Sequence, residues 1–410
     1  MKVSVIVPTF NRAHYLRECL DSLLAQTVAA SEIIVVNDGS TDNTAEILRE
    51  YGKAVRVIEK PNGGKSSALN VWLERASGDL VWIMDDDDVA LPDALERHVD
   101  ALERNPDAGF TYSSYLSGAF PVGLPWREAV VGLEEVRMPS LSDDELFVRC
   151  LEACFIMHQS MVVRKLCYDE VGPFDESLPR AHDHEMNLRL ARQYRGVRIG
   201  EPTFCLRLHA GERGTGTIRI PFERVEEFSR KDGISIYRRL HGELSLREYL
   251  PKNEQETPPE GWAVKALTQR ARIMVRKGVF DLAWADFVQS LDEVRMGGFR
   301  RQDLRLLYDV EKECVLQGNP DLARNMRAAM AKMAGRGGLS AITDLAKPYY
   351  YTSLFLKKKG RYGQSIRRLW QGLEVAAFAL VAGIGWGGND KSEALEVIAA
   401  DNRSADRTGN

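Results

Sequence analysis

The stretch "VWIMDDDDVALPD", Val81 to Asp93, places four consecutive carboxylates directly after a hydrophobic strand. Two carboxylates about 4 Å apart repel each other by about 4 kcal/mol at an effective dielectric constant near 20. Asp85 to Asp88 therefore cannot all stay charged in a dry pocket without a positive partner. The run indicates either a cation site or a solvated turn that leads into a helix near Pro92.

Around this run, apolar β-branched stretches alternate with helical patterns, which is typical of βαβ units and a mostly parallel sheet. We expect strands at residues 3–7, 32–37, 55–59, 80–84 and 109–113. We expect helices at residues 13–26, 41–51, 65–76, 92–104, 143–154 and 183–194. Ligands of such sheets bind beyond the carboxyl ends of the strands, so Pro8 to Arg12, Asn37 to Ser40 and Asp85 to Asp88 should share one rim.

Two further segments are expected near that rim. Residues 119–139 are rich in glycine, proline and aromatic side chains, and we expect a loop over the rim with little regular structure. The run "AGERGTGT", residues 210–217, is expected to form a flexible lid. Strand signals disappear beyond about Phe222.

The last third of the chain contains a weak internal repeat. Its three copies have a glycine followed five positions later by a small residue: Gly278 and Ala283, Gly318 and Ala323, Gly360 and Ser365. This pattern lets two amphipathic helices pack closely around a short turn and is similar to tetratricopeptide hairpins. The spacings of 40 and 42 residues exceed the usual period of about 34. A plain helical bundle is the alternative.

These patterns predict a two-domain organisation. We expect a doubly wound α/β domain at residues 1–221 and a linker with a connecting helix at 222–258. An all-α domain of helical hairpins should follow at 259–390, with a flexible tail at 391–410.

Composition and charge exclude several classes of protein. A formal net charge of −4 over 410 residues gives no general attraction to nucleic acid, so no nucleic-acid partner is expected. The six cysteines contain no CxxC pair, and the first apolar run, which ends at Pro8, is too short for a signal-peptide core. Both features favour a cytoplasmic protein with reduced thiols.

The longest uncharged apolar run, Val375 to Trp386, is too short to span a bilayer. The basic stretch "LKKKGRYGQSIRRLW" precedes it. This combination would suit peripheral contact at the inner face of a membrane. The alternative is a packed pair of terminal helices.

Four motifs occur in a specific order and spacing: "VSVIVPTFNR", "IIVVNDGSTDNT", "GDLVWIMDDDDVALPDAL" and "VGPFDESLPRAHDHEMNLRLA". Together they resemble the catalytic domain of family 2 glycosyltransferases, which has the GT-A fold, over residues 1 to 215. The resemblance implies a metal-assisted, inverting transfer of a sugar from a nucleotide-sugar donor to an acceptor hydroxyl.

The resemblance assigns a donor site to the first two motifs. Pro8, Thr9, Asn11 and Arg12 would lie near the base and the diphosphate of the donor. Thr9 and Asn11 could also cap the helix that follows. Asp38 matches the acidic residue that accepts a hydrogen bond from a pyrimidine ring, which favours a UDP-sugar, although a turn-forming role is the alternative.

The stretch "NGGKSSALN" corresponds to the part of the family that approaches the diphosphate. Many relatives have an arginine directly before Asn70, but this chain has Leu69 there. We transfer the phosphate role to Lys65, at a glycine-rich helix start that also favours anions. An exposed lysine without a ligand is the alternative.

The acidic run corresponds to the DxD-type motif, in which a carboxylate holds Mg²⁺ or Mn²⁺ against the donor diphosphate. Hard divalent ions prefer oxygen ligands, which makes this cofactor chemically reasonable. Asp87 is the first candidate ligand and Asp85 the second, whereas Asp86 would reach toward the ribose or the sugar. Asp88 is expected to be structural.

The catalytic base of the family lies at the start of a helix after "GPFDES", where this chain has Asp183. The usual glutamate before it is replaced by His182. A role of Asp183 as an N-cap only is the alternative. His209, in "CLRLHAGERG", corresponds to a histidine that can supply a further metal ligand, and Arg207 beside it could contact phosphate.

The expected partners are a nucleotide-sugar donor and a glycan, lipid-linked or protein acceptor. The helical domain could bind a further protein. One rival reading is an inactive adaptor that only binds sugar nucleotides, although the metal, uracil and base positions keep the residue types that catalysis needs. A nucleotidyltransferase would need a glycine-rich basic loop after the first strand, and "PTFNRAHY" lacks it.

Overall fold

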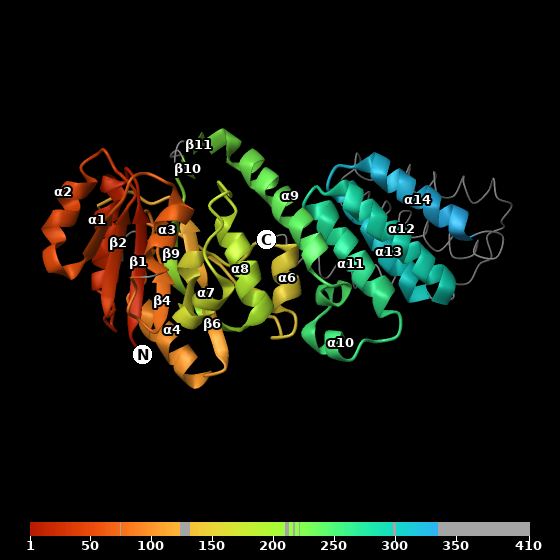
Figure 1. Cartoon of the computed structure of the whole chain (residues 1–410), viewed down its shortest axis with the longest axis horizontal. Coiled ribbons are helices and arrows are strands. Elements are labelled where there is room, and N and C mark those ends of the chain that lie inside the picture. The colour runs from red at the N-terminus through yellow and green to blue at the C-terminus, as the bar shows by residue number, and fades with distance from the viewer. Residues whose placement is uncertain are drawn as a thin grey trace. The chain divides into compact units, whose positions relative to one another are not determined.

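The computed structural model describes residues 1–73, 75–123, 132–209, 213–215, 218–220, 222–297 and 301–334 (Figure 1). Contacts divide the chain into two units. The first comprises Met1–Glu243 with Pro251–Asn253, and the second comprises Leu244–Leu250 and the chain from Glu254 onward. The donor-site, metal-site and base candidates all belong to the first unit.

The first unit is built on a sheet whose N-terminal half is parallel. Strand β1 (Val3–Thr9) lies between β2 (Glu32–Asn37) and β4 (Leu80–Ile83), and β3 (Arg56–Glu59) continues the sheet beyond β2. Every residue of β1 is buried. Strands covered on both faces read as continuous apolar runs, which is why "VSVIV" and "IIVV" signal the centre of the sheet.

The other half of the sheet is mixed. Strand β4 pairs antiparallel with β8 (Met161–Arg164), which in turn pairs antiparallel with β6 (Ala108–Gly118). Strand β6 runs parallel to β9 (Arg195–Arg207), and β9 pairs antiparallel with the short β5 (Val89–Ala90). The resulting order is β3-β2-β1-β4-β8-β6-β9-β5, with a ninth strand on β6. The predicted α/β sheet is therefore confirmed, with antiparallel strands that the sequence does not predict.

Six helices fill the predicted positions in the first unit, with shifted ends. They are α1 (Ala13–Leu24), α2 (Thr44–Tyr51), α3 (Lys65–Leu73), α4 (Ala94–Arg104), α6 (Leu146–Glu152) and α8 (His182–Gln193). Helix α2 begins three residues later than expected. The reason is Asp42, whose carboxylate accepts the N–H and hydroxyl of Thr44 and, on its other oxygen, the N–H of Ala13.

Three segments differ from expectation. The loop predicted at residues 119–139 contains strand β7 (Glu134–Val136), which pairs with β6, while residues 124–131 lie outside the described part. The segment predicted as a lid contains β10 (Arg213–Thr215), which pairs with β11 (Ile218–Ile220). Helix α9 (Val225–Glu243) falls in the predicted linker but groups with the first unit.

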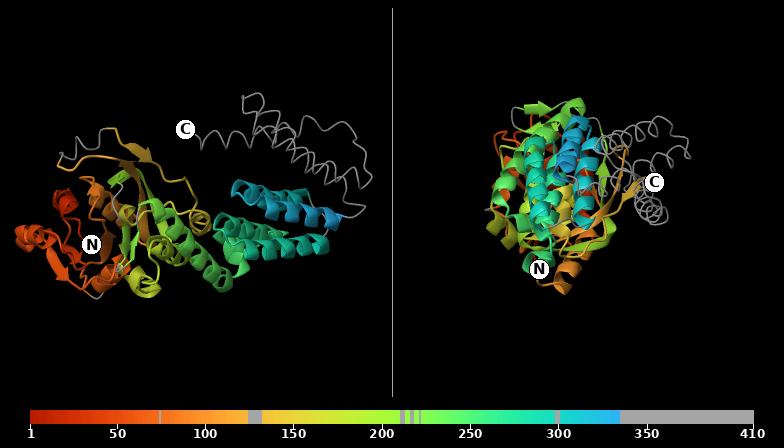
Figure 2. Two further views of the ribbon diagram at one scale, coloured as in Figure 1. Left: turned by 90° about the horizontal axis from the view of Figure 1, so that it is seen from above. Right: turned by 90° about the vertical axis from the view of Figure 1, so that its right-hand side faces the viewer.

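The second unit is helical. It contains α11 (Trp262–Arg276), α12 (Phe280–Gly297), α13 (Arg301–Leu316) and α14 (Pro320–Ala334), which lie side by side in the views of Figures 1 and 2. Two turns carry the predicted glycines, Gly278 at φ 77° and Gly318 at φ 74°. Ala283 and Ala323 are fully buried, as close helix packing requires. The third copy lies outside the described residues, and the likeness to tetratricopeptides stays a prediction.

Charged groups also join the helices of the second unit. Arg270 of α11 forms an ion pair with Asp286 of α12 at 2.6 Å, and Arg276 forms one with Glu313 of α13 at 2.9 Å. Both carboxylates are nearly buried. Because an uncompensated buried charge is costly, these pairs favour one register of the helices.

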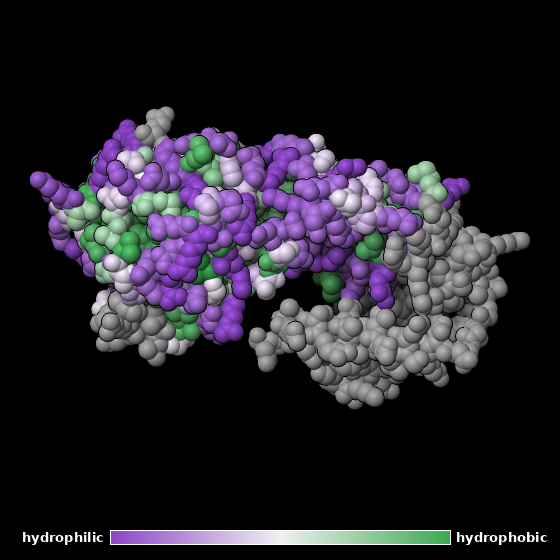
Figure 3. Space-filling view, turned by 90° about the horizontal axis from the view of Figure 1, so that it is seen from below, coloured by the Kyte–Doolittle hydropathy of each residue, from purple (hydrophilic) through white to green (hydrophobic). Residues whose placement is uncertain are grey.

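No helix in the described part of the chain is long and apolar enough to cross a membrane. Hydrophilic side chains dominate the described surface in Figure 3, with smaller apolar patches between them. The run Val375–Trp386 and the basic stretch before it lie outside the described residues.

Two glycines in open surroundings predict opposite effects of the same substitution. A Cβ at Gly318 or at Gly233 would meet no atom within 4 Å, but Gly318 has φ +74° and Gly233 lies inside α9. We expect Gly318→Ala to lower the free energy of unfolding by about 1–2 kcal/mol, the cost of a left-handed L-residue. We expect Gly233→Ala to raise it by about 0.8–1 kcal/mol. Urea unfolding of both variants measures these changes. If both substitutions changed the free energy of unfolding in the same direction, the positive φ of Gly318 or the helical backbone of Gly233 would be contradicted.

Buried His98 predicts that the first unit is sensitive to acid. Its Nδ1 bonds to Thr111 at 2.8 Å and its Nε2 to Thr203 at 3.3 Å, and burial lowers the pKa of His98 to about 3. Between this value and about 6.5 the unfolded chain binds a proton that the folded chain does not. Stability should therefore fall as the pH drops below about 6.5. Melting of the wild type and His98→Gln at pH 7.5, 6 and 5 tests this, since the variant should lose part of the slope.

Candidate active site

The loop after β1 is joined to the loop after β2 by one asparagine. Asn11 has a positive φ of 53°, which asparagine tolerates better than most residues. Its Oδ1 accepts the N–H groups of Thr41 at 2.7 Å and Asp42 at 3.3 Å, and its own N–H donates to the hydroxyl of Ser40 at 3.0 Å. Asn11 thus fixes the rim that also carries Pro8, Thr9 and Arg12.

Asp38, at the end of β2, organises the glycine-rich loop. Its carboxylate accepts the N–H groups of Gly63 at 2.9 Å and Gly64 at 2.7 Å, and the ammonium of Lys60 at 2.5 Å. Asn62 donates to the carbonyl of Asp38. The loop before α3 is therefore wrapped around this buried carboxylate. Lys60 was not singled out in the sequence, because its charge partner is 22 residues away.

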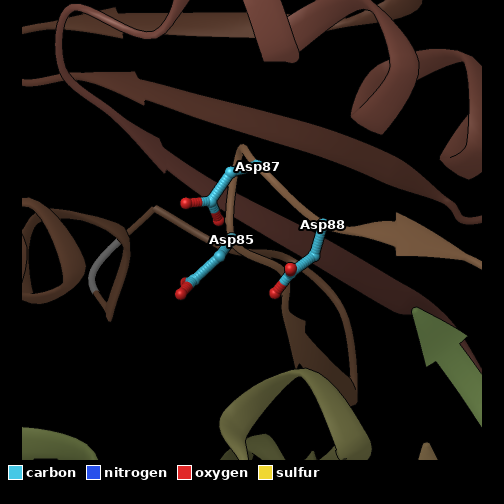
Figure 4. Close-up of side chains that lie close together, drawn as sticks. All are labelled: Asp85, Asp87 and Asp88. Atoms are coloured by element: carbon cyan, nitrogen blue, oxygen red, sulfur yellow. The ribbon is translucent and has the colours of Figure 1, made fainter. Parts of the chain in front are cut away.

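The acidic run forms a cluster at the end of β4 (Figure 4). Carboxylate oxygens of Asp85, Asp87 and Asp88 lie within 4.8 Å of one another. Lys65 contacts Asp85 at 2.5 Å. Arg12 contacts one oxygen of Asp87 at 3.1 Å, and His209 Nε2 lies 2.8 Å from the same oxygen. Two cations, Lys65 and Arg12, reach the acidic run from separate loops, and His209 approaches Asp87 from a third.

The cluster still holds an excess of negative charge. Burial, followed by the charge of Asp87, raises the pKa of Asp86 to about 7. Burial and the charges of Asp87 and Asp85 also raise the pKa of Asp88 well above its ordinary value. Oxygen ligands crowded at this distance fit a hard divalent cation, which would relieve the repulsion.

Both carboxylate oxygens of Asp88 make contacts within the protein. One oxygen accepts the side-chain N–H of Gln159 at 2.8 Å, and the other accepts the backbone N–H of Arg207 at 2.9 Å. Gln159 in turn accepts the indole N–H of the buried Trp82 through its carbonyl. Asp88 thereby ties the acidic run to β8 and β9.

Arg207, expected beside phosphate, instead supports the acidic run from within. Its Nε donates to the carbonyl of Asp87 at 3.0 Å and one terminal nitrogen donates to the carbonyl of Phe120 at 2.6 Å. The other terminal nitrogen contacts Glu18, and the guanidinium lies 3.7 Å from the ring centroid of Phe120. With only 2% of the residue exposed, these contacts leave Arg207 a structural cation.

Asp183 lies in the first turn of α8, whose N-terminus is held by a second carboxylate. Asp232 of α9 accepts the backbone N–H groups of Arg180 at 2.7 Å and Ala181 at 3.0 Å. A carboxylate at this position is favourable because the first N–H groups of a helix lack partners within it. The start of α8 is thereby fixed in place.

Asp183 is ionised at neutral pH. Burial alone would raise the pKa of this carboxyl, but the positive charges that His182 and His158 carry when protonated, followed by the charge of Lys65, hold it below its ordinary value. Lys65 responds in the opposite sense: burial lowers its pKa, but Asp85 and then Asp183 raise it. Lys65 therefore connects the acidic run electrostatically with Asp183.

The loop "GPFDES" between α7 (Lys165–Val171) and α8 is held from both sides. Arg189 of α8 donates to the carbonyls of Val171 at 2.7 Å and Pro173 at 2.8 Å. Asn70 of α3 exchanges two hydrogen bonds with the backbone of Phe174. Asn70 is thus a structural link, and Leu69 before it is fully buried.

His158 and Gln159 are two site residues that the sequence analysis did not single out. Both lie in the short 3₁₀ helix η2 (His158–Ser160) directly before β8. The signal that could have found them is the polar triplet "HQS" inside the apolar stretch "CFIMHQSMVV". A polar triplet at the start of a buried strand indicates a site at the rim of the sheet.

The chain is similar in sequence and in fold to several known proteins. Residues 4–170 match the model described as "Glycosyl transferase family 2". An uncharacterized glycosyltransferase of Rickettsia prowazekii is 30% identical over 55% of this chain and 69% of its own length. Hyaluronan synthase of Pasteurella multocida is 45% identical over 57% of this chain but only 24% of its own length. Similar solved structures include S. aureus TarS with UDP-GlcNAc, at 17% identity and a TM-score of 0.48 over 80% of this chain and 92% of that one.

Gln159 offers a test of how the acidic run is held. Gln159→Leu removes the side-chain donor to buried Asp88, so we expect the free energy of unfolding to fall by about 1–3 kcal/mol. Gln193→Leu, an exposed change on α8, should alter it by less than about 0.5 kcal/mol. Urea unfolding followed by circular dichroism measures both. Equal effects of the two variants would show that Asp88 does not depend on Gln159.

Proposed function

This chain belongs to family 2 of the glycosyltransferases and has an N-terminal GT-A domain, and from that premise we propose the reaction that it catalyses. It transfers a sugar from a UDP-sugar to an acceptor hydroxyl and inverts the configuration at the anomeric carbon. Asp183 is the proposed general base. The acceptor is a glycan.

The observation that carries this proposal is the position of Lys65 between two carboxylate sites. Its ammonium contacts Asp85 of the acidic run at 2.5 Å, and Asp183 is close enough to raise its pKa. A donor diphosphate at the acidic run would therefore lie near a charged base. Inverting transfer needs both groups at one anomeric carbon, the leaving group on one face and the base on the other.

The proposed chemistry is a single displacement. Asp183 takes the proton of the acceptor hydroxyl as the acceptor oxygen forms a bond to the anomeric carbon. The bond from that carbon to the diphosphate oxygen breaks at the same time, and UDP leaves with the electron pair. Because the pKa of Asp183 is held below its ordinary value, the carboxylate is available as a proton acceptor at neutral pH.

The uridine assignment rests on Asp38. Each carboxylate oxygen can accept two hydrogen bonds, and Gly64 is the partner of Oδ2 in the described residues. This oxygen retains the capacity to accept the N3–H of uracil. Pro8, Thr9 and Asn11 line the same rim, and Arg12 and Lys65 are the cations proposed for the diphosphate.

Asp85 and Asp87, with His209, are the proposed ligands of Mg²⁺ or Mn²⁺. When bound, such an ion neutralises the negative charge that develops on the diphosphate leaving group. Asp85 and Asp87 fit this role because they belong to the cluster whose ligand oxygens lie within 4.8 Å of one another, and His209 is included because its Nε2 lies 2.8 Å from Asp87. Asp86 is proposed to contact the ribose or the sugar.

The glycan acceptor is proposed from the named relatives. Hyaluronan synthase and chondroitin synthase of Pasteurella multocida, each 45% identical over the matched part, are polysaccharide synthases by name. The match covers 24% and 10% of their lengths, so the substrates of those whole proteins are not transferred. A lipid-linked glycan acceptor would fit the basic stretch near the C-terminus, and the second unit is proposed to bind a partner or the acceptor chain.

The base assignment predicts the kinetic outcome of one substitution. Asp183→Asn should lower sugar transfer by about 10²–10⁴-fold, the usual contribution of a general base. Binding of UDP, followed by calorimetry, should change little, because the carboxylate is not a donor contact. Asp169→Asn, at an exposed carboxylate on α7, is the matched control and should stay active.

The assay is UDP release from a panel of UDP-sugars with and without chelator. Loss of release with chelator and its return with Mn²⁺ would support the metal proposal. Equal activity of Asp183→Asn and the wild type would exclude Asp183 as the base. A wild type that binds no UDP-sugar would refute the proposed function as a whole.

A further inference from the structure

Two buried histidines near Asp183 leave ring nitrogens without a hydrogen-bond partner in the described residues. His158 is 2% exposed and His182 is 4% exposed. Neither ring nitrogen of His182 has a hydrogen-bond partner in the described residues, and the imidazole of His158 makes a polar contact there only with the backbone of Asp183. Leaving a buried polar atom unpaired costs about 1–3 kcal/mol, so such atoms are rare in folded proteins and call for an explanation.

Other buried histidines of the first unit behave differently. Both ring nitrogens of His98 bond to threonine hydroxyls, and Nε2 of His184 bonds to the hydroxyl of Tyr237 at 2.9 Å. These two rings are paired with the protein itself. The lack of partners is therefore specific to the pair that flanks Asp183.

The two rings come from different elements to one place. His158 lies on η2 and packs edge-to-face on Phe174, with ring centroids 5.4 Å apart. His182 directly precedes Asp183 on α8. The charges of Asp183 and Lys65 act on both imidazoles. The pair thus lies near the proposed base: His182 precedes it in the chain, and His158 interacts with its backbone.

Both imidazoles are neutral at physiological pH. Burial lowers the pKa of His158 to about 4 and that of His182 to about 3. A neutral imidazole offers one N–H donor and one nitrogen acceptor. A sugar hydroxyl is also one donor and one acceptor, so two such rings are complementary to two hydroxyl groups of one sugar.

We propose that His158 and His182 bind the acceptor, each through a hydroxyl group next to Asp183, and that they select a saccharide with a hydroxyl adjacent to the reacting one. This inference rests on the proposed function, in which Asp183 is the base. It narrows the acceptor class from any alcohol to a sugar with neighbouring hydroxyls. The glutamate that relatives have before the base offers only acceptors when ionised, whereas His182 can also donate.

The first experiment compares the stability of three leucine variants. His98→Leu strands the hydroxyls of Thr111 and Thr203 and should lower the melting temperature. His158→Leu and His182→Leu remove unpaired polar atoms, so the melting temperature of the ligand-free protein should stay or rise, as expected for residues kept for function. A fall equal to that of His98→Leu would show that the two rings serve the fold, and would overturn the inference.

The second experiment measures transfer against hydrolysis. UDP-GlcNAc and UDP-glucuronic acid are the donor probes, and p-nitrophenyl glycosides and their monodeoxy analogues are the acceptor probes. We expect His158→Leu and His182→Leu to lower the ratio of transfer to hydrolysis by at least about 10-fold. The replacements His158→Asn and His182→Gln, which keep a donor and an acceptor, should recover part of the loss.

The deoxy analogues identify the contact. Removing the hydroxyl that a histidine binds should cost the wild type at least about 10-fold in kcat/KM, and should cost the matching leucine variant much less. If the deoxy analogue and the leucine substitution each lowered kcat/KM by a separate factor, and the two factors multiplied when combined, the inference would be overturned.

If the wild type hydrolyses donors but glycosylates none of the acceptor probes, the comparison of melting temperatures decides. If it neither binds nor cleaves a donor, the proposed function fails, and the melting comparison still shows whether the rings serve the fold.

Discussion

Four adjacent carboxylates at the end of one strand are the constraint on which the rest of the site depends. Their mutual repulsion has to be offset, and the chain does this by bringing the cations Lys65 and Arg12 to them from two loops, while His209 hydrogen-bonds to Asp87 from a third. A fourth basic residue, Arg207, is buried beneath and holds the run by its backbone. The arrangement of the loops at this rim follows from the need to place these groups.

Polar links between distant segments keep this arrangement rigid. Asn11 joins the loops after β1 and β2, and Asp38 binds the glycine-rich loop before α3. Asn70 attaches α3 to the segment before α8. Each link uses a short side chain on backbone groups, which costs little side-chain entropy. The site is therefore preorganised before any substrate binds, as electrostatic catalysis requires.

Much of the first unit could be predicted from the sequence, because its signals are local. The apolar runs of β1, β2 and β4 and the helix patterns between them are periodic over a few residues, and the four motifs indicate the family. The antiparallel strands β7 and β8 could not be placed, because their pairing depends on residues far along the chain. The paired residues are separated by up to 84 positions, as for Leu80 of β4 and Arg164 of β8, and no local pattern records them.

The same limit applies to the candidate site. Asp183 and the acidic run are recognisable by motif, but the partners of Asp88 lie 71 and 119 residues away, and Asp232 is 51 and 52 residues from its partners at the start of α8. His158 was missed for this reason. His182 was noticed only as a departure from the family pattern, and its unpaired state emerged from the burial of the ring.

The anchoring of α8 by α9 limits where the first unit can be cut. The family match ends at residue 170, before Asp183 is reached, and a cut at residue 221 would keep Asp183 but remove Asp232 and Tyr237. Such a fragment would retain its donor loops while the first turn of α8 frayed. A fragment that is to keep this anchor must therefore extend through α9 to Glu243, so the helix that looks like a spacer in the sequence belongs with the first unit.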